Sequence, residues 1–149
     1  MVIADTSCLI TLERIGQLHL LYQLFSSLHT TQKVADEFGY PLPQWITILP
    51  VSDKSKQEEL TRIVEPGEAT AIALALETEN CLLIIDEKKD RRLAQQLDLQ
   101  IAGTLQILLV SKTKGIIHSI KALLDQLENN NFRFSPALKD DILRKAGEL

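Results

Sequence analysis

The sequence predicts an α/β protein, a three-layer α/β/α sandwich of the flavodoxin-like kind with a central parallel sheet. Short apolar runs rich in β-branched residues, Val2–Ala4 and Cys81–Ile85, suit strands that are buried on both faces. Segments with helical periodicity separate the apolar runs, and strands alternating with helices form right-handed crossovers to a parallel sheet. Because both runs are apolar throughout, we expect them to be central, adjacent strands.

The composition is that of an ordinary soluble globular protein, with 149 residues, of which 45% are hydrophobic and 24% charged. We expect one domain over residues 1–149, with a helical extension from about residue 116. Cys8 and Cys81 lie in apolar segments, which predicts buried thiols in a reducing compartment, the cytoplasm. No signal peptide or membrane anchor is expected. The formal charge of −4 argues against a non-specific binder of duplex DNA, but not against a nuclease with an acidic metal site.

The first half of the chain alternates between the strand and helix periodicities. After the first strand, Thr6 or Ser7 can cap a helix, and Gly16 interrupts the helical pattern. The predicted elements that follow are a helix beginning with Cys8–Leu12, a helix over His19–Phe25, a short strand over Leu28–Thr30, a helix over Gln32–Phe38, a weak strand over Trp45–Val51 and an amphipathic helix over Lys54–Val64.

The second half contains the clearest helix, which Pro66-Gly67-Glu68 opens and Ala69–Glu77 continues. This helix is alanine-rich and apolar on nearly every side, so we expect it to pack against the centre of the sheet. The remaining predicted elements are a strand over Cys81–Ile85, a charged helix over Glu87–Leu97, a strand over Leu99–Ala102, and helices over Leu105–Lys112, Ile117–Glu128 and Pro136–Ala146.

Acidic residues stand at comparable places in this scheme. Asp5 and Asp86 each follow an apolar strand, and open α/β sheets bind ligands outside the carboxyl ends of their strands. Glu68 lies in the first turn of the alanine-rich helix, and Glu37 lies near the end of an earlier helix. Asp5 and Asp86 could be plain helix caps. Glu68 could lie in the first turn of its helix only because a negative charge there interacts favourably with the helix dipole. Capping by the two aspartates does not explain Glu68, so the pattern favours a shared site.

Carboxylates gathered at one place repel one another, so a site of this kind needs a divalent cation or raised pKa values. Oxygen ligands suit Mg²⁺ or Mn²⁺, which retain bound waters and also bind phosphate. No cluster has the histidine and cysteine spacing of a zinc site, because His19, His29 and His118 are scattered. The donor set therefore favours Mg²⁺ or Mn²⁺.

Taken in order, four motifs resemble the PIN domain, a family of metal-dependent ribonucleases that includes the toxins of VapBC toxin–antitoxin pairs. They are Val2-Ile3-Ala4-Asp5-Thr6-Ser7, Val34-Ala35-Asp36-Glu37, Pro66-Gly67-Glu68-Ala69 and Leu83-Ile84-Ile85-Asp86. Two further stretches, Asp86-Glu87 with Arg91-Arg92-Leu93-Ala94, and Ile101-Ala102-Gly103-Thr104-Leu105, resemble one branch of PIN-like proteins. That branch usually has Asp-Asp where this chain has Asp86-Glu87. The resemblance covers Met1 to about Gly115, and the tail from Phe132 to Leu149 is also similar to this branch.

This resemblance implies an acidic pocket whose catalytic residues are Asp5, Glu37, Glu68 and Asp86. The metal ligands that it implies are Asp5, Glu68 and Asp86, around one ion or two. Many PIN toxins have aspartate where Glu68 stands, so its longer side chain must reach the metal from further back. Four other residues are candidates for supporting roles: Thr6, Ser7, Asp90 and Thr104.

The last acid of the pocket stays open between Asp86, Glu87 and Asp90. Asp86 and Asp90 are one helical turn apart and could both face the pocket, whereas Glu87 should point elsewhere. A basic run in the same helix is more often a solvated face than a nucleic-acid track. Its members are nevertheless candidates for RNA contact: Lys88, Lys89 and Arg91.

The resemblance implies a Mg²⁺- or Mn²⁺-dependent endoribonuclease that cleaves single-stranded or looped RNA, as the toxin of a type II toxin–antitoxin pair. The partners implied are RNA, a small antitoxin whose disordered tail brings Arg or Lys to Asp5 and Asp86, and a second copy of the chain. A homodimer is expected because His19–Phe25 has more hydrophobic residues than one buried face needs. The alternative is a non-catalytic PIN-like module that binds RNA or protein. Haloacid-dehalogenase-type phosphatases need a second aspartate where Ser7 stands, and phosphoreceiver domains need an acidic pair that is absent here.

Overall fold

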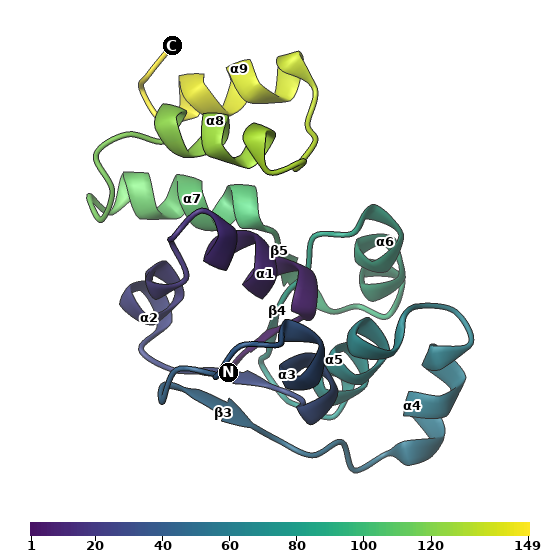
Figure 1. The fold of residues 1–149 in the computed structure, drawn as a ribbon. Coiled ribbons are helices and arrows are strands. Elements are labelled where there is room, and N and C mark those ends of the chain that lie inside the picture. The colour runs from purple at the N-terminus through teal and green to yellow at the C-terminus, as the bar shows by residue number, and fades with distance from the viewer.

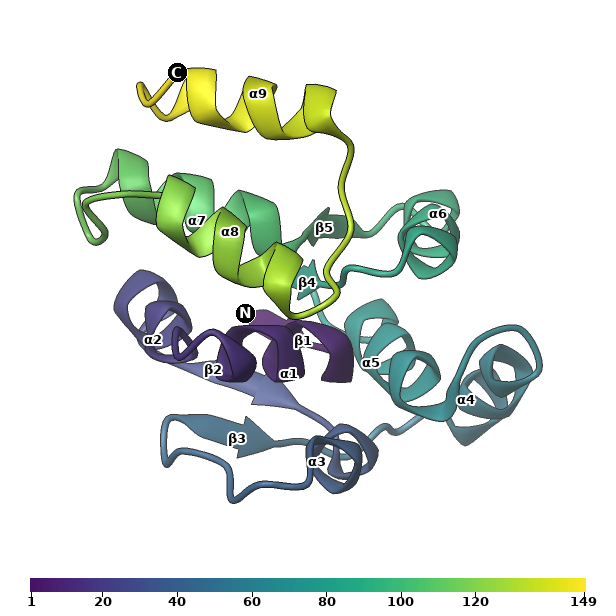
Figure 2. The same cartoon turned by 45° about the horizontal axis from the view of Figure 1, so that its top comes forward.

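The computed structural model describes residues 1–149 and has a central sheet of five short strands (Figure 1). The strands are β1 (Val2–Ala4), β2 (Leu28–Thr30), β3 (Ile46–Ile48), β4 (Leu82–Ile84) and β5 (Gln100–Ala102). Every neighbouring pair is parallel, and the order across the sheet is β3-β2-β1-β4-β5 (Figure 2). The predicted parallel sheet is therefore confirmed.

The two most apolar strands, β1 and β4, lie side by side at the centre, as the sequence predicts. Ile3 pairs with Leu83 and Ala4 pairs with Ile84, so the chain leaves both strands at the same level. The chain moves from β1 toward β2 but from β4 toward β5, so the direction of winding reverses between β1 and β4. In open α/β sheets, ligands bind at such a reversal, outside the carboxyl ends of the strands.

The strand order refines the comparison with flavodoxin. Flavodoxin has the order 2-1-3-4-5, whereas the order 3-2-1-4-5 found here is that of the first five strands of the dinucleotide-binding folds. The three layers and the parallel sheet are as expected, and only the position of β3 differs, since it lies at the edge beyond β2 and not between β1 and β4. Both orders place a winding reversal at the centre of the sheet, so the expected location of a site is the same.

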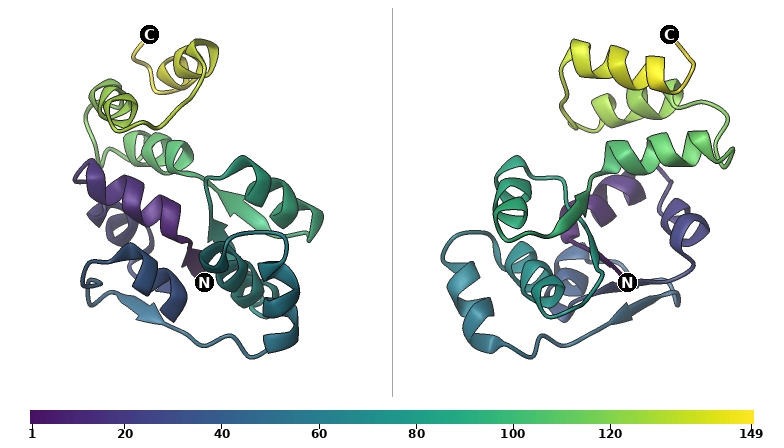
Figure 3. Two further views of the ribbon diagram at one scale, coloured as in Figure 1. Left: turned by 45° about the vertical axis from the view of Figure 1, so that its right-hand side comes forward. Right: turned by 180° about the vertical axis from the view of Figure 1, so that it is seen from behind.

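Helices on both faces of the sheet complete the three layers, and the last two of the nine helices lie outside these layers (Figure 3). Right-handed crossovers place the helices between β1 and β3 on one face and those between β3 and β5 on the other. The helix after β5 returns to the first face, where it contacts the first two helices. The helices are α1 (Thr6–Arg14), α2 (His19–Phe25), α3 (Gln32–Phe38), α4 (Lys54–Thr61), α5 (Pro66–Leu76), α6 (Lys88–Gln96), α7 (Thr104–Thr113), α8 (Lys121–Asn129) and α9 (Pro136–Lys145).

The helix α5 is the most buried helix of the fold, with every residue from Gly67 to Ala75 buried. Pro66 starts it, because proline lacks the N–H that the first helical turn leaves unpaired. Its small side chains let the helix axis approach β1 and β4, which it contacts. Because α5 runs antiparallel to the strands, its first turn lies at their carboxyl ends. The position of Glu68 is thus a consequence of how the core packs.

Three local expectations differ from the structure. The N-cap of α1 is Asp5 and not Thr6 or Ser7, because the Asp5 side chain accepts the Cys8 N–H. The strand predicted over Trp45–Val51 is reduced to β3, and Pro50, which has no N–H, cannot extend its ladder. The helix predicted from Ile117 begins only at Lys121.

The delayed start of α8 has a physical cause in Glu148. Its carboxylate accepts the N–H groups of Ile120 at 2.7 Å and Lys121 at 3.2 Å, the Ser119 hydroxyl at 2.9 Å, and the Lys112 ammonium at 2.9 Å. Partial burial opposes ionisation, but these hydrogen bonds outweigh it and lower the pKa of Glu148 to about 2. The carboxylate joins the chain after α9 to the start of α8, and these two helices stack beyond α7, away from the sheet (Figure 3).

We expect Glu148→Gln to lower the free energy of unfolding at pH 7 by about 1–2 kcal/mol, since hydrogen bonds to a charged group are lost or weakened. The pKa of Glu148 is lower in the folded chain than its ordinary value of 4.5, so its contribution is complete above that value. The contribution falls as the pH drops from about 4.5 toward 2. Urea denaturation between pH 7 and pH 3.5 should therefore show that the unfolding free energies of wild type and Glu148→Gln approach each other as the pH falls. Glu13→Gln, at an exposed position without an ion pair, is the control, and an equal, pH-independent loss in both variants would contradict the prediction.

Candidate active site

Asp5 occupies the end of β1 and is fully buried. Its carboxylate accepts the Cys8 N–H at 3.2 Å and the Ser7 hydroxyl at 3.1 and 3.2 Å. Burial raises the pKa of Asp5 well above its ordinary value, the bond from Cys8 opposes this, and the nearby carboxylates of Asp86 and Glu68 raise it further. Asp5 is thus a helix cap and also one member of a group of acids. Ser7 holds this carboxylate, as proposed for a supporting residue, whereas Thr6 does not.

Asp86 follows β4 and lies beside Asp5 at the reversal point. Its two carboxylate oxygens accept from the same residue: the Thr104 N–H binds Oδ1 at 2.7 Å and the Thr104 hydroxyl binds Oδ2 at 2.6 Å. Burial raises the pKa of Asp86, although the two bonds from Thr104 and the charge of Arg91 lower it in part. The first residue of α7 therefore fixes the orientation of Asp86.

Glu68 brings a third carboxylate to this edge from the first turn of α5. It is 8% exposed, and its Oε2 atom is buried without a hydrogen-bond partner. Burial raises the pKa of Glu68, and the carboxylates of Asp90, Glu37 and Glu65 add to this effect. A buried carboxylate oxygen without a partner is energetically costly and rare in native structures. The free oxygen is the kind of atom that a cation would satisfy.

Glu37 reaches the same edge from α3. Its Oε1 atom accepts the Thr6 hydroxyl at 2.8 Å, while the rest of the residue is exposed. A Cβ atom on Gly67 would collide with Glu37 Oε1 and come within 2.7 Å of Thr6 Oγ1. Glycine at position 67 therefore makes room for the Thr6–Glu37 contact beside Glu68.

The structure separates the three acids after β4 by burial. Asp86 is half-buried and Asp90 is 6% exposed, whereas Glu87 is exposed. Burial, together with the charge of Glu87, raises the pKa of Asp90 to about 6, with Lys89 opposing the effect. Asp90 is close enough to Glu68 for its charge to raise the pKa of Glu68. Asp86, whose charge acts on Asp5, and Asp90, whose charge acts on Glu68, both lie within the acidic group, whereas Glu87 is exposed to solvent.

The donor set fits a hard divalent cation, because it consists of carboxylate oxygens together with hydroxyl groups. The free Oε2 of Glu68 and the burial of Asp5 beside the carboxylates of Asp86 and Glu68 point the same way. In the side-chain positions of this structure, however, no three acidic residues come close enough together to enclose an ion. Ligation by three carboxylates at once would require these side chains to draw together.

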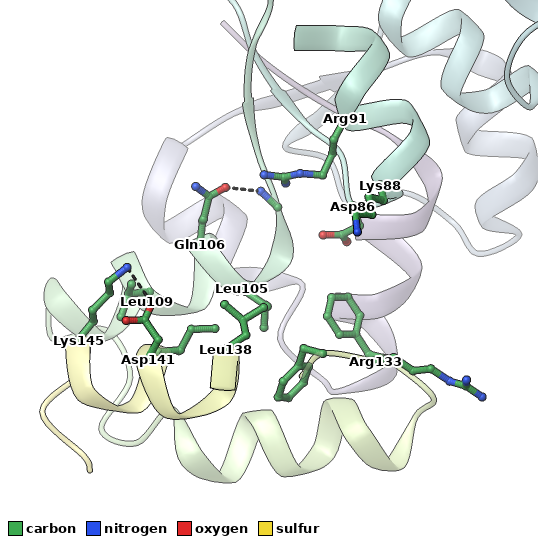
Figure 4. A pocket seen from close by; sticks show the side chains of 14 residues that line it. Asp86, Lys88, Arg91, Leu105, Gln106, Leu109, Arg133, Leu138, Asp141 and Lys145 are labelled. Atoms are coloured by element: carbon green, nitrogen blue, oxygen red, sulfur yellow. Dashed lines mark hydrogen bonds and ion pairs between the residues drawn. The ribbon is translucent and has the colours of Figure 1, made fainter. Parts of the chain in front are cut away.

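A cleft of about 540 Å³ opens beside Asp86, between the start of α6, α7, α9 and the loop that joins α8 to α9 (Figure 4). Of the three basic residues that the sequence suggested for RNA contact, Lys88 and Arg91 line it, whereas Lys89 is exposed outside it. Arg91 also donates to the Ile85 carbonyl at 3.0 Å, which holds its guanidinium close to Asp86. The cleft thus joins positive charge to one end of the acidic group.

Sequence reasoning missed two features of this edge. It named Thr104 only as a candidate supporting residue. The two hydrogen bonds that connect Thr104 to Asp86 could not be foreseen, because 18 residues separate the two along the chain. Sequence reasoning also gave no role to Gly103, where an added Cβ would lie 3.0 Å from Asp86 Oδ1 and 2.5 Å from Arg91 Nη1. The sequence signal that could have indicated both features is the pair Gly103-Thr104, which follows a short strand. It is equivalent to Asp5-Thr6 and Asp86-Glu87, because each pair follows a strand of the sheet.

The fold and these acids define a class of protein: an open parallel α/β domain with carboxylates at the carboxyl ends of its central strands. A family model described as a PIN domain matches residues 1–148, and the chain therefore belongs to the PIN-domain family. PIN domains are generally nucleases that use divalent metal ions, so the family indicates a module of the nuclease type. No curated protein and no solved structure matches the chain. None of the helices is both long and apolar enough to cross a membrane.

Proposed function

We propose that this protein is a Mg²⁺- or Mn²⁺-dependent endoribonuclease that acts on single-stranded or looped RNA. The observation that supports this most is the meeting of Asp5, Asp86 and Glu68 at the winding reversal, with one buried oxygen of Glu68 left without a partner. These three residues would hold the metal. A divalent ion at such a site supplies Lewis-acid chemistry, activating water for attack and neutralising charge on the phosphate.

The chain's own residues would then position the reacting groups. Ser7 and Thr104 fix the carboxylates of Asp5 and Asp86 by hydrogen bonds. Glu37, held by Thr6, or Asp90, beside Glu68, would orient the attacking water. The remaining contact, to the RNA backbone, falls to the basic residues that line the cleft.

The direct test is cleavage of an unstructured RNA oligonucleotide followed by gel electrophoresis, with Mn²⁺, with Mg²⁺ and with EDTA. We expect internal cleavage with either metal and none with EDTA. Duplex RNA of the same sequence should be cut more slowly, because its phosphates are held in a regular helix. Equal cleavage with EDTA, or cleavage only from the ends of the RNA, would refute the proposal as stated.

Within this function, we assign the protein the role of the toxin in a type II toxin–antitoxin pair, acting in the cytoplasm. An acidic pocket in a cleft is a concentrated negative field, and the simplest inhibitor is a peptide that brings Arg or Lys into it. A small antitoxin with a disordered tail that folds as it binds fits this requirement. Such a partner should compete with Mn²⁺ and should bind the Asp86→Asn variant more weakly than wild type. If neither Mn²⁺ nor the substitution changed the partner's affinity, the partner would inhibit by binding away from the acidic residues.

We also propose a homodimer formed through α2. Tyr22 is 50% exposed, and Leu24 and Phe25 on the same helix are only partly buried, so α2 retains apolar surface after packing on α7 and β2. Light scattering of the wild-type protein at micromolar concentration should give twice the mass of one chain. The Tyr22→Glu variant should give the mass of a single chain.

A second candidate is a non-catalytic PIN-like module that binds RNA or protein. The observation in its favour is that no three acids are close enough to enclose an ion. Such a module would bind RNA without cleaving it and would not respond to Mn²⁺.

The orientation of Asp86 gives a graded prediction. Thr104→Val removes the hydroxyl that donates to Asp86 Oδ2 and keeps the backbone N–H that donates to Oδ1. We expect RNA cleavage to fall about 10- to 100-fold, the usual effect of removing a group that orients a metal ligand. Thr104→Ser retains the hydroxyl and should stay close to wild type. Equal loss in Val and Ser variants would mean that the methyl group, and not the hydrogen bond, is what Thr104 contributes.

A further inference from the structure

The cleft beside Asp86 combines basic residues, to which the proposed function gives contact with the RNA backbone, with an apolar surface to which it gives no role. Lys88 and Arg91 lie with Asp86 on one side, and Leu138 of α9 lies on another (Figure 4). Two half-buried aromatic residues, Phe132 and Phe134, add to the apolar lining of the cleft. The volume of about 540 Å³ lies within the range of roughly 300–1,000 Å³ that is usual for small-ligand sites. The cleft is therefore large enough for a flat, partly apolar group with a negative charge at one end.

The aromatic rings lie on the loop between α8 and α9, with their centroids 6.1 Å apart and their planes inclined at 55°. Both rings pack against the core and remain partly exposed. Arg133 lies between them in the sequence and is exposed, with its guanidinium directed outward from the same loop (Figure 4). Aromatic faces alternating with cations are the usual platform for unpaired bases.

Charge favours a polyanion at this cleft. The chain as a whole has a formal charge of −4, yet Lys88, Arg91 and Arg133 gather here and none of them forms an ion pair. Lys145, also at the cleft, is paired with Asp141 at 3.0 Å. Three cations that form no ion pair, of which only Arg91 lies beside a carboxylate, suit a nucleotide strand better than an apolar peptide when two aromatic rings lie next to them.

We propose that this cleft binds an unpaired nucleobase of the RNA strand, stacked on Phe132 or Phe134, with its phosphate held by Lys88 and Arg91 at the Asp86 end. This rests on the proposed function, because it makes the cleft the part of the substrate site that receives the base flanking the scissile phosphate. It assigns the α8–α9 loop to substrate binding and makes single-stranded RNA the preferred substrate, since a base within a duplex cannot enter.

Binding is measured in EDTA, so that it does not depend on cleavage. The probe is a fluorescein-labelled 12-nucleotide single-stranded RNA, read by anisotropy, and a second RNA carries 2-aminopurine, whose fluorescence falls when it stacks. We expect Phe134→Leu and Phe132→Leu each to weaken RNA binding on the order of tenfold. If one ring can replace the other, the same loss should appear in the double variant. Fluorescence quenching of 2-aminopurine should be present in wild type and lost in the double variant. Leucine removes the aromatic face but keeps an apolar side chain that can pack against the core. A thermal melt of each variant checks that it is folded.

Two neighbouring lysines provide a matched pair of substitutions at exposed positions, which should leave the fold unchanged. Lys88 and Lys89 are both exposed on the first turn of α6, and only Lys88 lines the cleft. Lys88→Gln should weaken binding several-fold and reduce the slope of log affinity against log salt by about one, whereas Lys89→Gln should change neither.

The outcomes separate this inference from the proposed function. If wild type cleaves RNA with Mn²⁺ but the phenylalanine variants bind as wild type does and 2-aminopurine is not quenched, the cleft does not hold a base, and the inference fails alone. If RNA binds in EDTA with the expected losses but is never cleaved, the base site stands and the nuclease function fails. Equal affinity for duplex and single-stranded RNA would also overturn the base site.

Discussion

Asp5→Asn should abolish metal-stimulated RNA cleavage without weakening the metal-free fold. The substitution removes the charge that would hold the cation, and metal catalysis supplies several kcal/mol of transition-state stabilisation, so the loss should be on the order of a thousandfold or more. The amide can still accept the Cys8 N–H and the Ser7 hydroxyl. Because burial opposes ionisation of Asp5, a neutral side chain there should leave the free energy of unfolding unchanged or higher.

The measurements are RNA cleavage rate and thermal melting, each with Mn²⁺ and with EDTA. Mn²⁺ should raise the Tm of wild type by selective binding to the folded state, and this increase should be lost in Asp5→Asn. Asp98→Asn is the matched control, because Asp98 is exposed and has a φ of 61°, which asparagine adopts easily. If Asp5→Asn were strongly destabilised in EDTA, Asp5 would be a structural cap whose charge the fold requires.

Leu83→Ala should have the largest effect on stability. Leu83 is fully buried in β4, where it pairs with Ile3 of β1 on one side and Ile101 of β5 on the other. Removing its side chain leaves a cavity in the centre of the core, at a cost of about 3 kcal/mol. For a chain of this size the Tm should fall by roughly 6–12 °C. Asp86 would be affected indirectly, because β4 positions it.

The comparison variant is Val110→Ala on α7, where the side chain is 43% exposed. This change should cost less than about 0.5 kcal/mol, since little buried surface is removed. Urea denaturation of the three proteins gives both the unfolding free energies and the m-values. Equal stabilities for Leu83→Ala and wild type would show that β4 is not at the centre of the core.

Where packing follows directly from local composition, the sequence predicts this fold well. The apolar runs at Val2–Ala4 and Leu82–Ile84 are adjacent central strands because residues without polar side chains must be covered on both faces. The alanine-rich helix is the most buried one for the same reason. The strand order could not be predicted in this way. It depends on the side of the sheet to which each crossover adds the next strand, and local composition does not determine that side.

The candidate site divides in the same way. Asp5, Glu68 and Asp86 could be placed together from the sequence, because each follows a strand or opens the buried helix at one edge of the sheet. The contacts that orient them could not, because they join distant segments: Thr104 to Asp86, and Thr6 to Glu37. Asp5 shows why a cap and a site residue need not be alternatives, since the end of a parallel strand is both the start of a helix and the edge where ligands bind.

The most direct test of the account is isothermal titration of Mn²⁺ into the wild-type protein and into Asp5→Asn, Glu68→Gln and Asp86→Asn, with Asp98→Asn as control. We expect a saturable heat of binding in wild type and in the control, and a much weaker or absent heat in each of the three variants. Heat of dilution alone in the wild-type protein, or unchanged binding in all three variants, would contradict the central claim that these carboxylates form a metal site.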